Sequence, residues 1–215
     1  MAAEPLQKPL RLAAVVLAGG QGLRMGGADK GLVPWQGQAL VDWMLQALRA
    51  QEGVRWQALA ISANRNLSDY AQRGLPLLQD DLAHRAQGPL AGMLQALRFA
   101  KQAGCDAVWL LPCDTPLLPP DLAQRLVQGL LSQNAPAIAP AFEQAEGPPR
   151  WQAAHVLLRT ELAPALQTLF DQGERRLQAA LRHLGAQPLL LPPEQAGGFG
   201  NFNALADLQE STPAR

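Results

Sequence analysis

A short apolar stretch that runs directly into a glycine-rich loop constrains this chain more than any other feature. Residues 13–17 are typical of a buried strand, and five glycines follow between positions 19 and 27, together with Arg24 and then Lys30. Glycine lets the backbone approach a ligand and turn its N–H groups inward, and the two cations neutralise phosphate oxygens. The stretch therefore predicts a triphosphate site at the end of a strand.

Two better-known phosphate loops do not fit this stretch. The Walker A pattern requires glycine directly before its lysine and serine or threonine after it, whereas Asp29 precedes Lys30 and Gly31 follows. The dinucleotide fingerprint would start at Gly20 and require glycine or alanine at the position of Met25. The loop is therefore of a third kind, and a flexible surface loop is the alternative interpretation.

Composition favours one globular domain over residues 1–215, with residues 1–10 as a loose tail. Hydrophobic residues make up 48% of the 215 positions, which is enough for a sizeable core. The 18 basic and 18 acidic residues balance, so neither nucleic acid nor an anionic membrane surface is expected as a partner. Cys105 and Cys113 flank an apolar strand and fit no zinc spacing, so we expect reduced thiols in a cytoplasmic protein. We also expect no targeting segment.

Strand and helix patterns alternate along the chain and predict an α/β fold: a three-layer α/β/α sandwich, Rossmann-like, with a mostly parallel sheet. Strands are expected at 13–17, 58–62, 75–78, 107–111, 136–139, 153–158 and 188–191. Helices are expected at 39–50, at a short stretch capped by Ser68, after Gly88, after Asp121, after a cap at Thr160, at 174–184 and from Ala204 onward. In the first of these, the spacing places five apolar side chains on one face: Leu40, Val41, Met44, Leu45 and Leu48.

Asp114 follows the predicted strand 107–111 within the run Pro112-Cys113-Asp114-Thr115-Pro116. Ligands of parallel sheets lie at the carboxyl ends of the strands, so this carboxylate is expected at the site. Mg²⁺ takes oxygen ligands and keeps part of its shell as water and phosphate, so a single carboxylate suits it. A turn or helix-capping aspartate is the alternative. The glycine-rich loop in the same fold favours a metal ligand.

The motifs of the first loop resemble the signature of a known family. The runs Leu17-Ala18-Gly19-Gly20 and Arg24-Met25-Gly26-Gly27-Ala28-Asp29-Lys30-Gly31-Leu32 are similar to those of the molybdenum cofactor guanylyltransferases, which are nucleotidyltransferases with a glycine-rich N-terminal loop. The resemblance implies transfer of GMP from GTP to Mo-molybdopterin, with Mg²⁺ as cofactor and pyrophosphate as the second product. It implies a nucleotide-binding half over 11–120 and a pterin-side half over 121–215.

The resemblance also assigns residues. Catalytic roles fall to Arg24, Lys30 and Asp114, with Asp114 as the metal ligand. The nucleotide contacts are expected from Leu17, Ala18, Gly19, Gly20, Lys30, Ser62, Asp80, Gly88 and Asp114. Ser62 stands where the family typically has asparagine and retains a single hydroxyl for hydrogen bonding. Asp80 is selected by counting forward from the preceding strand, whereas counting back from Gly88 selects Asp81.

The second half of the sequence is less specific. The run Gly173-Glu174-Arg175-Arg176 resembles a family stretch near the pterin, where the arginines could pair with its phosphate, and a solvated helix face is the alternative. Asn201 and Asn203 resemble the closing segment of the family. His84, His155 and His183 are scattered and receive no role.

Three functional hypotheses follow for this chain. A guanylyltransferase would use GTP and Mo-molybdopterin, act as a monomer, and hand its product to molybdoenzyme apoproteins or their chaperones. A cytidylyltransferase for the same cofactor would share the fold and the metal. A nucleotide-binding protein that delivers the cofactor without chemistry is the third hypothesis, and pyrophosphate release would separate it from an enzyme.

Overall fold

The computed structural model describes residues 9–19, 29–81 and 88–200 of the chain. In these ranges an eight-stranded sheet has the order β10-β7-β9-β6-β1-β4-β5, with β8 paired to β7. Its strands are β1 (Leu12–Leu17), β4 (Trp56–Ser62), β5 (Leu77–Leu78), β6 (Ala107–Pro112), β7 (Ala137–Phe142), β8 (Arg150–Trp151), β9 (Leu157–Arg159) and β10 (Gln187–Leu190). β9 is antiparallel to β6 and β7, β8 is antiparallel to β7, and the other pairings are parallel.

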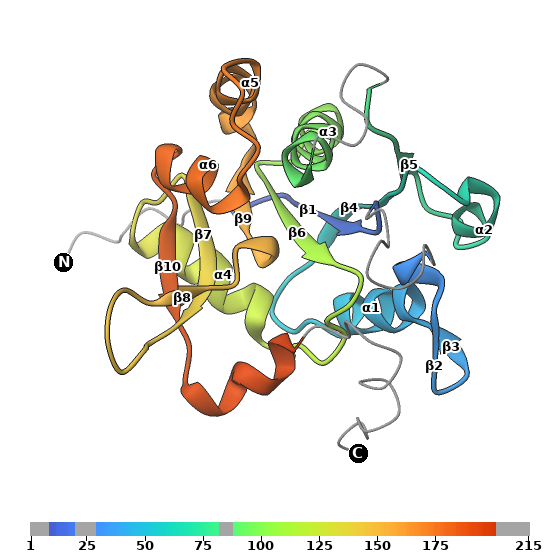
Figure 1. Ribbon diagram of the computed structural model, residues 1–215, viewed down its shortest axis with the longest axis horizontal. Helices are drawn as coiled ribbons and strands as arrows, with labels where there is room; N and C mark the ends of the chain where they lie inside the picture. The colour runs from blue at the N-terminus through green and yellow to red at the C-terminus, as the bar shows by residue number, and fades with distance from the viewer. Residues whose placement is uncertain (1–8, 20–28, 82–87, 201–215) are drawn as a thin grey trace.

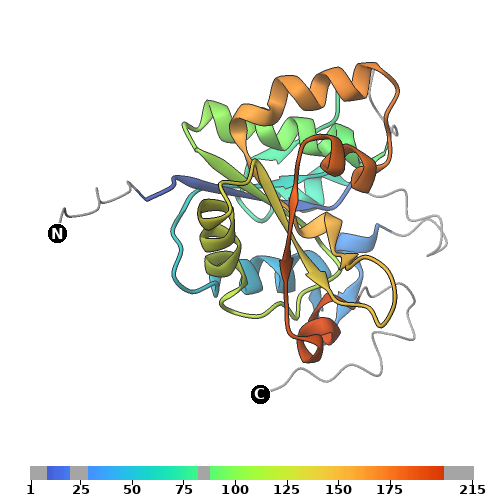
Figure 2. The same ribbon diagram turned by 90° about the vertical axis from the view of Figure 1, so that its left-hand side faces the viewer.

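Helices cover both faces of this sheet (Figures 1 and 2). α1 (Leu40–Arg49) and α4 (Leu122–Ser132) pack on one face, and α3 (Pro89–Gln102), α5 (Ala163–Asp171) and α6 (Leu177–His183) pack on the other. The short helix α2 (Leu67–Ala71) lies beside β5 at the edge of the sheet (Figure 1). The predicted three-layer α/β/α sandwich with a mostly parallel sheet is therefore confirmed.

The central strand β1 is buried on both faces because both of its neighbours are parallel strands covered by helices. Successive side chains of a strand point to opposite faces. Ala14 and Val16 accordingly belong to the core under α1 and α4, whereas Ala13 and Val15 belong to the core under α3. This explains why the residues of β1 are all apolar, instead of alternating between apolar and polar.

Helix α1 follows from the spacing of its apolar residues. The side chains predicted to share one helical face, Leu40, Val41, Met44, Leu45 and Leu48, are all buried. A hairpin of β2 (Pro34–Trp35) and β3 (Gln38–Ala39), which the sequence analysis did not predict, leads into the helix. Its turn residues Gln36 and Gly37 have φ of 49° and 82°, as two-residue hairpin turns require.

The structure differs from two of the predicted elements in the second half of the chain. The expected strand 153–158 is wrong: the 3₁₀ turn η4 (Ala153–His155) comes first, and β9 begins only at Leu157. The expected helix 174–184 begins at Leu177. Its first residues are held outside the helix because the Glu174 carboxylate accepts the backbone N–H groups of Arg175 and Arg176, each at 2.9 Å.

Two predicted helix caps are also wrong. Thr160 donates its hydroxyl to the carbonyl oxygens of Cys105 at 3.0 Å and Asp106 at 3.3 Å, and the 3₁₀ turn η5 (Thr160–Leu162) precedes α5. Asn66 rather than Ser68 occupies the cap position of α2. Asp121 does occupy the cap position of α4, as predicted. The helix expected from Ala204 onward lies outside the described residues.

None of the helices in the described part of the chain is long and apolar enough to span a membrane.

Candidate active site at the carboxyl edge of the sheet

Four parallel strands end in one row at the same edge of the sheet. Leu17, the last residue of β1, pairs with Ser62 of β4 on one side and with Pro112 of β6 on the other. Ser62 in turn pairs with Leu78, the last residue of β5. The segments that follow these strands therefore emerge side by side, although they are far apart in the sequence.

Lys30 and Asp114 meet at this edge. Lys30 opens the 3₁₀ turn η2 (Lys30–Leu32), and Asp114 follows β6 by two residues. The Lys30 Nζ donates a hydrogen bond to the Asp114 Oδ2, and the side chains are 21% and 10% exposed, respectively. The structure thus brings together the cation of the first loop and the carboxylate of the predicted metal site, separated by 84 positions in the chain.

The donors at this edge fit a magnesium ion that is bound together with a triphosphate. Asp114 offers hard carboxylate oxygens, is only 7% exposed, and already receives a cationic group in the Lys30 ammonium. Among the described residues, no group of three or more His, Cys, Asp or Glu side chains forms a metal site of its own. Mg²⁺ usually takes one or two carboxylates and completes its shell with water and phosphate oxygens, so this sparse donor set suits it.

Asn64 links the first loop to the end of β5. Its side-chain amide makes two bonds with Asp80: Nδ2–H donates to Asp80 Oδ2, and Oδ1 accepts from the Asp80 backbone N–H, both at 2.8 Å. A Cβ at Gly19 would approach Asn64 Nδ2 to 3.2 Å, so glycine allows the loop to pass close to this amide. Asp80 is 9% exposed.

Asp81, the alternative to Asp80 in the sequence, lies elsewhere. Its carboxylate pairs with Arg98 of α3 at 2.8 Å, and its side chain is 49% exposed. Asp80 therefore belongs to the cluster with Asn64, whereas Asp81 belongs to an exposed ion pair.

Ser62 and Gly88 lie toward α3 at the same edge. Ser62 is buried, and its Oγ would be 3.4 Å from a Cβ placed on Gly92 in the first turns of α3. Gly88 precedes α3 with φ of 90°, a conformation that favours glycine. A Cβ on Gly88 would lie 3.5 Å from the carbonyl oxygen of Arg175, so the start of α3 is next to the segment 173–176.

The segment 173–176 borders a cavity of about 530 Å³ that is lined by Leu169, Gln172, Gly173, Glu174, Arg175, Arg176 and His183. Arg175 stacks its guanidinium over the Phe170 ring, 3.9 Å from the centroid, and donates to the Phe170 carbonyl at 2.6 Å. Arg176 keeps its side chain 84% exposed. Its Nε also lies 3.4 Å from the Glu174 carboxylate, so both arginines contact the protein, and they differ in how far the guanidinium is open to solvent.

Four residues named from the sequence lie outside the described residues. They are the predicted site residues Gly20 and Arg24, and Asn201 and Asn203 of the segment that resembles the closing segment of the family. Leu17 and Ala18 are described and lead into the loop, and the Ala18 backbone N–H donates to the Ser62 carbonyl at 2.8 Å.

His155 is a buried residue at this edge that the sequence analysis left without a role. Its Nε2 shares a hydrogen bond of 3.0 Å with the hydroxyl of Thr115, the residue after Asp114, and both residues are at most 3% exposed. The ring of Phe199 stands edge-on against it, with the centroids 5.1 Å apart. Burial lowers the pKa of His155 to about 3. No sequence signal marks this contact, because His155 and Thr115, 40 positions apart, belong to no common motif and follow no ligand spacing.

We expect this histidine to make the protein sensitive to acid. An unfolded histidine binds a proton below its ordinary pKa of about 6.5, while the folded protein leaves His155 neutral down to about pH 3. Stability contributed by the neutral ring is therefore complete above about pH 6.5 and falls as the pH decreases toward 3, by up to about 1.4 kcal/mol per pH unit. Urea unfolding between pH 7 and 5 should show this slope.

The variant His155→Gln keeps a polar group near Thr115 and should flatten the slope. The matched variant His183→Gln, at an exposed position, should retain the wild-type slope. Equal slopes in wild type and His155→Gln would contradict a neutral buried His155.

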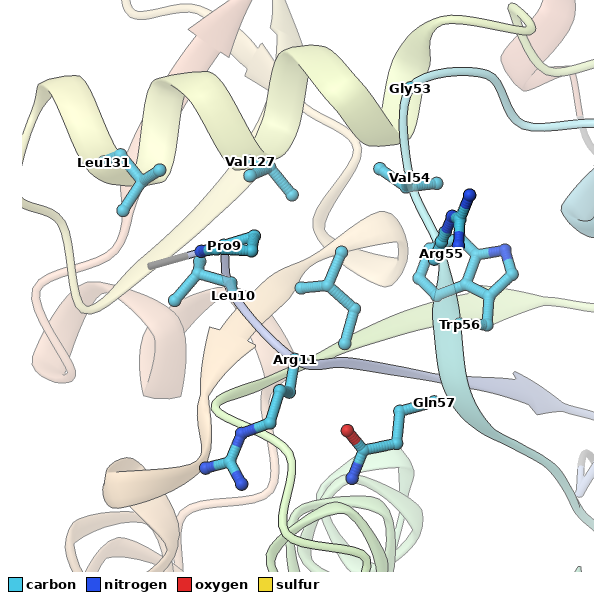
Figure 3. Close-up of a pocket in the computed structure, with 11 residues that line it drawn as sticks. Pro9, Leu10, Arg11, Gly53, Val54, Arg55, Trp56, Gln57, Val127 and Leu131 are labelled. Atoms are coloured by element: carbon cyan, nitrogen blue, oxygen red, sulfur yellow. The ribbon is translucent and has the colours of Figure 1, made fainter. Parts of the chain in front are cut away.

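A larger cavity, of about 640 Å³, lies at the amino end of β1 and β4 beside α4 (Figure 3). Pro9, Leu10, Val54 and Val127 line its apolar part, and Arg11 lies at its border (Figure 3). The Arg11 guanidinium is bonded to Asp106, with the closest approach at 2.8 Å. Because ligands of parallel sheets bind at the carboxyl ends of the strands, this cavity is not the candidate active site.

The fold and the carboxyl-edge site together define a nucleotidyltransferase: a mostly parallel sheet between helices, whose first strand leads into a glycine-rich loop, with a lysine and an aspartate bonded to each other at its carboxyl edge. The sequence from residue 14 to residue 187 matches the family described as MobA-like NTP transferase domain, and the chain belongs to that family.

Curated relatives and a solved structure agree with this membership. The chain is 40% identical to the molybdenum cofactor guanylyltransferase of Pasteurella multocida, over 93% of this chain and 98% of that protein. It is 36% identical to the one of Cupriavidus metallidurans, over 90% and 91%. A solved structure from Archaeoglobus fulgidus, described as molybdopterin-guanine dinucleotide biosynthesis protein A, shares the fold with a TM-score of 0.71 at 20% identity, over 92% of this chain and 95% of that chain.

Proposed function

We propose that this protein transfers GMP from GTP to Mo-molybdopterin, forming Mo-molybdopterin guanine dinucleotide and pyrophosphate. The contact between Lys30 and Asp114 carries the proposal, because it puts a cation and a metal-binding carboxylate beside the loop expected to hold a triphosphate. The relatives named above, which are molybdenum cofactor guanylyltransferases, support the choice of guanine nucleotide and acceptor.

The proposed reaction is an in-line attack by the terminal phosphate of the pterin on the α-phosphorus of GTP. A new P–O bond forms to the α-phosphorus while its bond to the bridging oxygen of pyrophosphate breaks. Both reactants are anionic, and two unit charges about 4 Å apart repel by about 4 kcal/mol at an effective dielectric constant of about 20. The attacking oxygen is already ionised, so the reaction requires no general base.

Lys30, Arg24 and the backbone N–H groups of the glycine-rich loop are assigned to offset this repulsion. Lys30 opens a 3₁₀ turn at the strand edge, so its ammonium is placed before the substrate arrives. Asp114 would hold Mg²⁺, which when bound supplies positive charge to the triphosphate and to the departing pyrophosphate.

The nucleotide is assigned to the edge formed by β1, β4, β5 and the start of α3. In the described residues the proposed contacts are Leu17, Ala18, Gly19, Lys30, Ser62, Asp80, Gly88 and Asp114, and Gly20 is added from the sequence. Asp80 is a carboxylate held by Asn64, and a carboxylate can accept from the N1 and N2 donors of guanine, which cytosine does not offer as a pair.

The acceptor is assigned to the cavity beside residues 173–176. This cavity adjoins Gly88 of the proposed nucleotide set, so the two substrates would meet there. The exposed guanidinium of Arg176 is the group we assign to the pterin phosphate, since Arg175 is held by Phe170. We further propose a monomeric, cytoplasmic enzyme, in line with the free thiols of Cys105 and Cys113.

Nucleotide preference is the sharpest first test. With Mg²⁺ present, a ligand at 100 times its dissociation constant stabilises the folded state by about 2.7 kcal/mol, which corresponds to a rise in Tm of about 5–10 °C for a chain of this size. We expect this rise with GTP and much smaller rises with ATP and CTP at the same concentration. A thermal-shift series measures it directly.

A larger rise with CTP would instead support the cytidylyltransferase hypothesis. Pyrophosphate release in the presence of Mo-molybdopterin then distinguishes an enzyme from a delivery protein. A protein that binds GTP tightly and releases no pyrophosphate would contradict the proposed function.

A further inference from the structure

Asp29 is a buried carboxylate, and side chains from the segment after β4 bond both of its oxygens. The Tyr70 hydroxyl donates to Oδ1 at 2.6 Å, and the Asn66 amide donates to Oδ2 at 2.9 Å. Asp29 is 9% exposed, and Tyr70 is completely buried. A carboxylate that is removed from water needs such donors. Asp29 is therefore fixed in place, directly before Lys30.

Tyr70 also fixes the residue on the other side of Lys30. A Cβ at Gly31 would collide with the Tyr70 hydroxyl oxygen, and it would lie 3.3 Å from the Cβ of Ala18. The phenol therefore fills the space that the missing side chain of Gly31 leaves. One tyrosine thus contacts both neighbours of Lys30, which restricts the backbone from which the ammonium extends toward Asp114.

The segment 62–70 holds the described residues on both sides of the glycine-rich loop. On one side, the Ser62 carbonyl accepts from the Ala18 N–H at 2.8 Å. On the other side, Asn66 and Tyr70 bond Asp29. Asn66 adopts φ of 47°, a left-handed conformation that asparagine tolerates, and its carbonyl accepts from the Tyr70 N–H at 3.2 Å.

We propose that Asp29, Asn66 and Tyr70 form a positioning unit that holds Lys30 at Asp114 and thereby sets the rate of nucleotidyl transfer. The inference rests on the proposed function, because it is the role of Lys30 in that reaction that the unit serves. Burial, followed by the hydrogen bond to Asp29, raises the pKa of Tyr70, so the hydroxyl stays a donor throughout the neutral range.

The test uses Tyr70→Phe, which removes one oxygen and keeps the ring. Loss of a hydrogen bond to a charged group should lower kcat about tenfold, while the KM for GTP changes by less than about threefold. In a Lys30→Ala background the same substitution should have no further effect on kcat, because the unit acts through Lys30. A purely structural role would lower activity in both backgrounds.

A matched control removes a different contact of the same helix region. Arg73, just after α2, pairs with Asp42 of α1 at 2.7 Å, a contact separate from the hydrogen bonds that Asn66 and Tyr70 donate to Asp29. Asp42→Ala should keep the wild-type kcat even where its Tm falls as much as that of Tyr70→Phe. An equal fall of kcat in Asp42→Ala would mean that general loosening of α2 explains the effect.

A second readout does not depend on turnover. Lys30 is 21% exposed on its side chain, while Lys101 near the end of α3 is exposed. Acetylation by acetic anhydride, followed by peptide mass spectrometry, should label Lys30 faster relative to Lys101 in Tyr70→Phe, and at the wild-type ratio in Asp42→Ala. An inactive wild-type protein would overturn the proposed function alone. Unchanged Lys30 labelling, or an unchanged kcat in an active enzyme, would overturn the positioning unit.

Discussion

Lys30→Ala is expected to lower kcat/KM for GMP transfer by about 10²–10³-fold while leaving the protein folded. Removing one preorganised charge from a site where negative charge develops typically costs about 3–4 kcal/mol of transition-state stabilisation. The Lys30 ammonium is held at Asp114 before the substrate arrives, and a cation from solution would not take up the same fixed position. Steady-state pyrophosphate release measures the loss.

The control for this variant is Lys101→Ala, which removes the same charge from the last turn of α3. It should retain wild-type kcat/KM, so any fall seen with Lys30→Ala is specific to its place and not to net charge. Lys30→Ala with full activity would remove Lys30 from the catalytic set.

Asp114→Asn is expected to have an effect of the same order and to abolish the stabilising effect of Mg²⁺ on the GTP complex. The amide keeps the shape of the side chain but removes the charge that would hold the divalent cation. It also leaves the ammonium of Lys30 without its buried counter-charge, which costs stability. Thermal shift with GTP, with and without Mg²⁺, separates loss of the metal from loss of the fold.

Asp121→Asn provides the matched control. Asp121 lies in the connection between β6 and α4, at the cap position of the helix, with its side chain 46% exposed. This variant should keep the difference in Tm between GTP alone and GTP with Mg²⁺. A Mg²⁺ effect that survives in Asp114→Asn would mean that another group holds the metal.

Periodicity was a reliable guide where one element packs through a single apolar face. All five residues predicted for the shared face of α1 are buried. The apolar run at residues 13–17 likewise predicted a buried strand, and β1 has residues in the cores on both faces of the sheet. The predicted helix starts were wrong where a side chain forms hydrogen bonds with the backbone, either locally or in another segment. Thr160 bonds the carbonyls after α3 and caps no helix, and Glu174 takes the N–H groups of the next two residues, so α6 starts later than predicted.

The same distinction applies to the candidate site. Lys30 and Asp114 were recognisable because each follows an apolar strand, and a parallel sheet gathers the residues that follow its strands. The hydrogen bond between His155 and Thr115 and the bonds of Asn66 and Tyr70 to Asp29 were not predicted. They join segments separated by about 40 positions and follow no spacing rule.

The amino-acid sequence by itself determined the α/β class and the strand-to-loop motif, and it predicted the residue types for a triphosphate site, because each depends on neighbours in the chain. Tertiary structure decided where two adjacent carboxylates lie: Asp80 bonds Asn64, whereas Asp81 pairs with Arg98 on α3. It also decided what holds Lys30 in place. Both outcomes depend on the pairing of β1, β4, β5 and β6, which brings segments that are far apart in the chain side by side at one edge of the sheet.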